Sequence, residues 1–129
     1  MRTREDIESY IIRSGLASQE VGEDMWLVHE PEAAEHIVIR MAGPMVLFRM
    51  KVMELDQVSR KADLYERLLR YNAEEMVHGS YGIADGAVVV TCALRLENLD
   101  FNEFQGTVDD FSMALTNHHQ TLASYRDAA

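Results

Sequence analysis

Residues 68–104 constrain the fold of this chain more than any other part of it. They read LLRYNAEEMVHGSYGIADGAVVVTCALRLENLDFNEF, in which a helix end is followed by a glycine-containing turn and two strand-like runs. The pair Asp85-Gly86 between those runs is a strong β-hairpin signal and predicts a short strand over 81–84 and a long one over 87–96. Each polar residue here has a structural task, so the segment specifies a fold rather than a reaction.

A last helix is predicted directly after this hairpin. Asp100 is suited to be its N-cap, and Glu103, three residues later, completes a capping-box pattern. Leu99 and Phe104 have the spacing of the hydrophobic staple that accompanies such a box. Apolar residues then recur at helical spacing toward the C-terminus, at Phe104, Val108, Phe111, Leu115 and Leu122.

The first part of the chain predicts a helix followed by strands. Thr3 is suited to cap that helix and Gly15 to end it. Strands are expected over 18–21, 25–29, 36–41 and 45–53. A polar connector at 31–35 separates the two pairs. The last two strands alternate with a period of two and meet at a turn over 42–44, which predicts antiparallel pairing.

A second helix is predicted to begin near Ser59 and to end near Asn72. Its wide apolar stripe is expected to comprise Ala62, Leu64, Tyr65, Leu68, Leu69 and Tyr71. We expect Asn72 to satisfy backbone groups or to adopt a left-handed turn, as asparagine often does at a helix end. Gly79 and Gly82 are expected to have positive φ angles.

These elements give the order α-β-β-β-β-α-β-β-α. That order predicts an α+β fold, in which three helices pack on an antiparallel sheet. A length of 129 residues suits one domain with a core of its own, so a single domain over 1–129 is expected. Trp26 is expected to be a core anchor of that domain.

The segment also resembles the YbjN-like family and its relatives, the type III secretion chaperones of the CesT kind. The resemblance lies in Leu68-Leu69-x-x-Asn72-Ala73 followed by Gly79-x-Tyr81-Gly82 and a long hairpin. It implies a type III secretion chaperone-like fold that is frequently dimeric and that holds partner segments in extended form. It implies no catalytic residues, and it assigns no contact residue.

Composition narrows the possible partners. A net charge of −10 argues against nucleic acid, because binding phosphates requires clustered Lys and Arg. The charge suits either simple solubility or a basic, amphipathic protein partner. No apolar run reaches the roughly 20 residues that span a bilayer. The charged N-terminus lacks a secretory h-region and the single Cys92 fits a reducing compartment, so a cytoplasmic location is expected.

The sequence contains only weak evidence for catalytic or metal-binding residues. A possible ligand group, His29, Glu30, Glu32, Glu35 and His36, lies around the connector and lacks any known ligand spacing. His118 and His119 point about 100° apart on a helix, so they cannot ligate one ion from one face. Asp109 and Asp110 are likewise adjacent on a helix and cannot bind one ion from one face. They are predicted to lie on its solvated face. Cys92 lies on an apolar strand face as an inert thiol. We therefore expect no enzyme activity, no metal and no cofactor.

One strand face resists a purely structural explanation. It carries Met45, Leu47, Arg49, Lys51 and Met53. Flexible Met is favoured on surfaces that accept varied apolar partners, whereas two cations are expensive to bury without partners. A partly covered surface suits this mixture. The face is predicted to be a peptide or dimer surface; core filling remains the competing interpretation.

The leading functional hypothesis is a non-enzymatic, chaperone-like domain that binds a segment of a partner polypeptide, as a homodimer. The alternative is a regulatory or scaffolding homodimer in bacterial signalling that binds no client. A small enzyme or ligand-binding protein with an unrecognised site is a third hypothesis.

Overall fold

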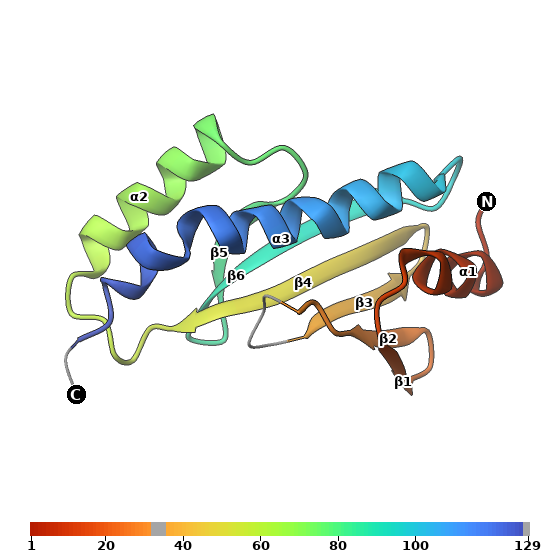
Figure 1. Ribbon diagram of the computed structural model, residues 1–129, viewed down its shortest axis with the longest axis horizontal. Helices are drawn as coiled ribbons and strands as arrows, with labels where there is room; N and C mark the ends of the chain where they lie inside the picture. Colours follow the sequence, from red (N-terminus) through yellow and green to blue (C-terminus); the bar gives the residue numbers. More distant parts are fainter. Residues whose placement is uncertain (32–35, 128–129) are drawn as a thin grey trace.

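A computed structural model describes residues 1–31 and 36–127 of the chain (Figure 1). Within these residues three helices and a six-stranded antiparallel sheet follow the predicted order. The elements are α1 (Arg4–Ser14), β1 (Ser18–Gly22), β2 (Met25–Val28), β3 (Ile37–Ala42), β4 (Met45–Glu54), α2 (Lys61–Glu74), β5 (Ser80–Ala84), β6 (Ala87–Arg95) and α3 (Phe101–Ala123). The strands lie side by side in the order β1-β2-β3-β4-β6-β5, so the fold class predicted from the sequence is confirmed.

The core lies between the helices and one face of the sheet. Phe48 of β4 makes edge-on ring contacts with Phe104 and Phe111 of α3, at centroid distances of 5.4 and 6.4 Å. Tyr10 of α1 contacts Phe104 as well, so α1 and α3 share one core. In Figure 1 the long helix α3 runs across the sheet, with α1 at the end near β2 and β3 and α2 at the other end. Trp26 is buried in this core, as predicted.

Local sequence signals fix both ends of α1 and the start of α3. Thr3 and Asp100 each form the reciprocal hydrogen bonds of a capping box, with Asp6 and Glu103 respectively. Gly15 ends α1 in the left-handed region, at φ 77°. Leu99 and Phe104, the predicted staple, are both buried. These predictions are confirmed.

The start and the buried face of α2 differ from prediction. The helix begins at Lys61, and the backbone N–H and the hydroxyl of Ser59 both donate to Asp127, 68 residues away. Its buried face consists of Leu64, Leu68 and Tyr71. Leu69, predicted to lie on that face, is 68% exposed.

A β-bulge in β4 overturns the predicted position of Met53. Lys51 pairs with Val89 while Met53 pairs with Val88, so one residue of β4 is extra between them. The alternation therefore shifts after Lys51, and Met53 points into the core at 3% exposure. The prediction that Met53 shares a face with Leu47 is wrong.

Gly79 and Gly82 differ in backbone conformation. Gly79 has the predicted positive φ, 89°, and a Cβ there would lie 2.6 Å from the carbonyl oxygen of Thr91. Gly82 lies inside β5 and is not among the residues with positive φ. The prediction for Gly82 is wrong because the hairpin reverses at Asp85-Gly86, where both residues have positive φ.

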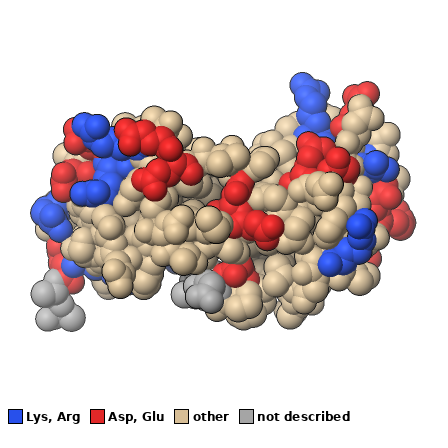
Figure 2. All heavy atoms as spheres, turned by 45° about the horizontal axis from the view of Figure 1, so that its top comes forward, with Lys and Arg blue, Asp and Glu red and all other residues tan. Residues whose placement is uncertain are grey.

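Charge is unevenly spread over the molecule. Figure 2 shows a face whose middle carries acidic side chains, while basic side chains lie mainly toward its two ends. With a net charge of −10, the potential near that middle favours a basic partner.

Candidate functional site

The predicted peptide or dimer surface lies on the sheet face opposite the core. Met45 and Leu47 are half-buried there, and Arg49 and Lys51 are exposed. Met53 does not belong to this outer face, since the bulge turns it inward. The role of Met45, Leu47, Arg49 and Lys51 in binding stays a prediction.

The two cations of the outer face have acidic neighbours. Arg49 lies 3.8 Å from Asp85 of the β5–β6 turn, and Lys51 forms an ion pair with Glu54. A shallow hollow of about 260 Å³ lies beside them, lined by His36, Val38, Arg49, Lys51, Glu54, Ala84, Asp85, Ala87 and Val89.

The backbone groups at the two edges of the sheet differ in their hydrogen bonding. At the β5 edge, the side chain of Asn72 hydrogen-bonds both the N–H and the carbonyl of Tyr81. This confirms the prediction that Asn72 satisfies backbone groups. At the other edge β1 is exposed along its whole length, and in the sheet it pairs with β2 alone. An unpaired strand edge offers N–H and C=O groups to another chain.

The ladder shows which groups of β1 face outward. The His29 N–H donates to the carbonyl of Ala17, and Gln19 lies opposite Leu27 in the same register. Because bonding alternates along an antiparallel pair, Ser18 and Glu20 direct their backbone groups away from β2. The register shifts between Glu20 and Gly22, a bulge that limits how far a further strand can continue.

A groove runs beside this open edge, between α1 and β1. It has a volume of about 180 Å³ and is lined by Glu8, Ile11, Ile12, Ser18, Glu20 and Trp26. Ile12 of α1 and Val21 of β1 are exposed apolar residues at this end of the molecule. The sequence did not reveal the groove, because the groove depends on how α1 packs over β1.

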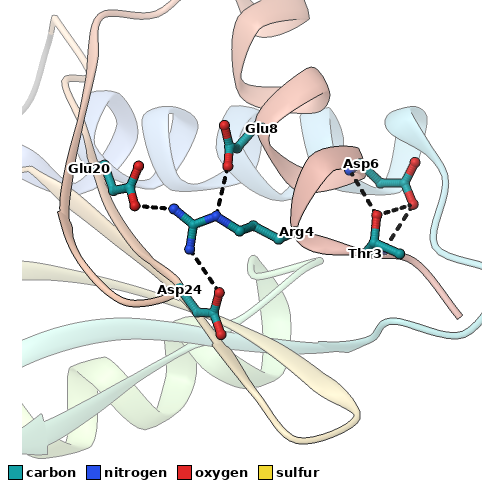
Figure 3. A network of polar contacts seen from close by, with 6 residues as sticks. All are labelled: Thr3, Arg4, Asp6, Glu8, Glu20 and Asp24. Carbon is teal, nitrogen blue, oxygen red and sulfur yellow. Dashed lines mark hydrogen bonds and ion pairs between the residues drawn. The ribbon is translucent and has the colours of Figure 1, made fainter.

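Arg4 holds the β1–β2 hairpin against α1 (Figure 3). Its guanidinium donates to Glu8 at 2.9 Å and to Asp24 at 2.9 Å, forms an ion pair with Glu20, and lies over the Trp26 ring. Its hydrogen bonds to the carboxylates of Glu20 and Asp24 raise the pKa of Arg4 above its usual value. The network positions the edge strand, although exposed ion pairs contribute little to stability.

A buried histidine joins α2, β5 and α3, and the sequence did not predict it. His118 is 3% exposed and stacks on the ring of Tyr71 at 3.7 Å. Its Nδ1 lies 2.7 Å from the Tyr81 hydroxyl and its Nε2 lies 3.2 Å from Glu75 Oε1. Burial, followed by the nearby Tyr71 and Glu75, raises the pKa of Tyr81. Residues on three elements form this cluster, so spacing along one helix could not reveal it.

Other candidate chemical residues have structural roles. Asp110, predicted to be solvated, accepts from the backbone N–H of His78 and contacts its imidazole. Cys92 is half-buried, and burial raises the pKa of its thiol. The rings of His29 and His36 lie 5.7 Å apart, whereas Glu32 and Glu35 fall outside the described residues.

Over 1–31 and 36–127, no group of three or more His, Cys, Asp or Glu side chains could hold a metal ion. In the same residues, no helix combines the length and apolar character needed to cross a membrane.

This chain matches a known protein family. The model of the CesT_Tir_1 family matches residues 1–128. A search of curated proteins found no match.

Solved structures share the fold at low sequence identity. The ExsC–ExsE complex matches with a TM-score of 0.69 and 15% identity, covering 100% of both chains. YbjN from E. coli matches with a TM-score of 0.66 and 15% identity, covering 92% of this chain and 93% of that one. The ExoU–SpcU heterodimer from the type III secretion system of Pseudomonas aeruginosa matches with a TM-score of 0.64 and 15% identity, covering 93% and 97%.

Proposed function

Because this chain belongs to the CesT_Tir_1 family, we propose that it holds a segment of a partner polypeptide and performs no chemistry on it. The observation that carries the proposal is the unpaired edge of β1 beside a groove in which Ile12 is exposed next to the carboxylates of Glu8 and Glu20. The solved complexes of ExsC with ExsE and of SpcU with ExoU support a partner-binding use of this fold.

An extended segment fits the β1 edge. Its backbone would hydrogen-bond to the outward groups of Ser18 and Glu20, in the manner of strand addition. Alternate side chains of the segment would then reach the groove near Ile12. Main-chain bonds supply affinity for many sequences in this mode, and the groove selects apolar side chains. At the β5 edge Asn72 already occupies the backbone groups of Tyr81, which favours β1 as the edge for this addition.

The outer sheet face is proposed to join two copies of the chain. Arg49 and Lys51 lie on the same face as Glu54 and Asp85, so the face carries both charge signs. A two-fold interface brings one patch against itself, and a patch of mixed sign can complement its copy. Leu47, half-buried among these charges, would be covered in the dimer. We place this homodimer in the cytoplasm.

A second function, a regulatory or scaffolding homodimer without a client, has one observation in its favour. The E. coli YbjN neighbour is described as a candidate transcription regulator. The outer face serves both hypotheses, whereas the β1 edge serves client binding alone.

Affinity capture from cells that produce this protein tests the proposal. The test variant combines Ser18→Pro with Val21→Lys. Proline is tolerated at the first residue of a strand, and there it removes an outward donor; lysine on an edge opposes strand addition. Glu23→Lys, in the same hairpin, is the charge control. We expect a polypeptide to co-purify with wild type and Glu23→Lys and to be lost with the double variant. Equal recovery with all three proteins would contradict the β1 site.

A further inference from the structure

A second hollow lies between the loop after α2 and the middle of α3. It has a volume of about 110 Å³ and is lined by Glu75, Met76, Val77, Asp110, Met113, Ala114, Asn117 and His118. It is separate from the β1 edge, because none of its lining residues belongs to α1, β1 or β2.

Three contacts hold its walls in place. The backbone N–H of His78 donates to Asp110 at 3.1 Å, and the His78 imidazole contacts the same carboxylate. Glu75 lies 3.2 Å from the buried His118 of α3. Gly79 lies where any Cβ would be close to Thr91 and Phe111, so the loop packs tightly on β6 and α3. A hollow fixed in this way is preorganised, which lowers the entropy cost of binding.

Two apolar side chains stand unusually exposed at its rim. Val77 is 78% exposed and Met113 is 57% exposed, and they come from the two elements that enclose the hollow. Met76 and Ala114, which are more buried, continue this apolar lining inward. Exposed apolar residues that converge on one concave site indicate a binding surface. Met in particular adapts to partner side chains of different shapes.

The charge around the hollow selects the partner. The lining includes the carboxylates of Glu75 and Asp110 and contains no Lys or Arg. The side chains of Glu75 and Asp110 remain 48% and 26% exposed. A second copy of this chain, placed with the same patch against it, would oppose carboxylates to carboxylates.

We propose that this hollow binds a partner segment in which an aliphatic or methionine side chain is followed by Lys or Arg. The apolar side chain enters between Val77 and Met113, and the cation lies near Glu75 and Asp110. This contact gives the chain a sequence preference that strand addition at β1 does not supply. It does not depend on the β1 site.

Titration of the full-length protein with short peptides tests the proposal, with backbone amide chemical shifts as the readout. The probes are the blocked hexapeptides Gly-Ser-Leu-Lys-Ser-Gly, Gly-Ser-Leu-Glu-Ser-Gly and Gly-Ser-Ser-Lys-Ser-Gly. A single contact of this size is expected to bind its peptide with a dissociation constant of ~1 mM. The Leu-Lys peptide should shift the amides of Val77, Met113 and Asn117. Each of the other two should bind about 10-fold more weakly, since each lacks one of the two recognition elements.

Variants separate this surface from other apolar residues. Val77→Thr keeps the shape of the side chain and Met113→Gln keeps helix propensity, so both should fold with an unchanged melting temperature. Together they should weaken Leu-Lys binding about 10-fold. Leu69→Gln, at a site 68% exposed on α2, is the matched control and should leave binding unchanged.

Three results would overturn the proposal. The first is equal binding of all three peptides. The second is a shift confined to the amides of β1 (Ser18–Gly22), which would place the segment at the edge strand instead. The third is a concentration-dependent shift of Val77 and Met113 without peptide, which would make the hollow a contact between copies.

Discussion

The side-chain amide of Asn72 pairs with the backbone of Tyr81 as a neighbouring strand would. The Tyr81 N–H donates to Asn72 Oδ1 at 2.7 Å, and Asn72 Nδ2 donates to the Tyr81 carbonyl at 3.1 Å. One helix residue thereby satisfies the outward backbone groups of Tyr81, the second residue of β5. The backbone groups of Tyr81 are thus occupied, whereas β1 pairs with β2 alone, and the proposal of strand addition at β1 rests on this asymmetry.

Asn72→Ala should lower the free energy of unfolding by about 2 kcal/mol, since two hydrogen bonds worth ~1 kcal/mol each are lost. Urea denaturation followed by circular dichroism measures the change. Asn102→Ala, at an exposed position in the first turn of α3, is the matched control and should cost little. Equal midpoints for the two variants would mean that the Asn72 pairing adds nothing.

Gly79→Ala should destabilise the protein by about 1–3 kcal/mol because of its left-handed backbone, with a further cost from the contact with Thr91. Gly82→Ala should change stability by no more than about 0.5 kcal/mol, because Gly82 lacks a positive φ and no atom lies within 4 Å of the added Cβ. Thermal melts of both variants test this pair. The account of the turn fails if Gly82→Ala is the more damaging change.

Met53→Asp should destabilise the fold by several kcal/mol, because it places a carboxylate in the core without a partner. Leu47→Asp, on the outer face, should leave the melting temperature of the monomer nearly unchanged and weaken the proposed dimer. Light scattering and calorimetry distinguish the two effects. A well-folded Met53→Asp protein would contradict the bulge in β4.

Asp6 should contribute to stability in a pH-dependent manner. The Thr3 backbone N–H donates to its carboxylate at 2.8 Å, which lowers the pKa of Asp6 below the ordinary aspartate value of 3.8. A depressed native-state pKa stabilises the fold above the unfolded-state pKa, and this contribution disappears as pH falls through the native-state value.

Asp6→Asn should therefore melt below wild type at neutral pH and approach it at about pH 2. Glu23→Gln, in the exposed β1–β2 turn, removes a charge without disturbing the cap. A stability difference that stays constant from neutral to acidic pH would show that the carboxylate charge is not responsible.

The sequence predicted features that depend on neighbouring residues. The N-cap at Thr3, the capping box at Asp100 and the hairpin turn at Asp85-Gly86 each depend on residues close together in the sequence, and each was found. Their geometry requires particular residue types at fixed spacing, so periodicity and composition are sufficient evidence.

Features that depend on distant residues were missed. Ser59 binds Asp127 instead of starting α2, and the bulge that buries Met53 arises from pairing with β6. The His118 cluster and the open edge of β1 depend on the packing of α3 and on the strand order. Alternation along one strand carries no information on any of these.

Hydrogen–deuterium exchange on the captured complex tests the central claim most directly. If a partner segment adds to the sheet, the amides of Ser18 and Glu20 should exchange much more slowly in the complex than in the free protein. Exchange at Tyr81, already bonded to Asn72, should stay the same. Unchanged exchange at Ser18 and Glu20 in a complex that contains a bound polypeptide would contradict the account.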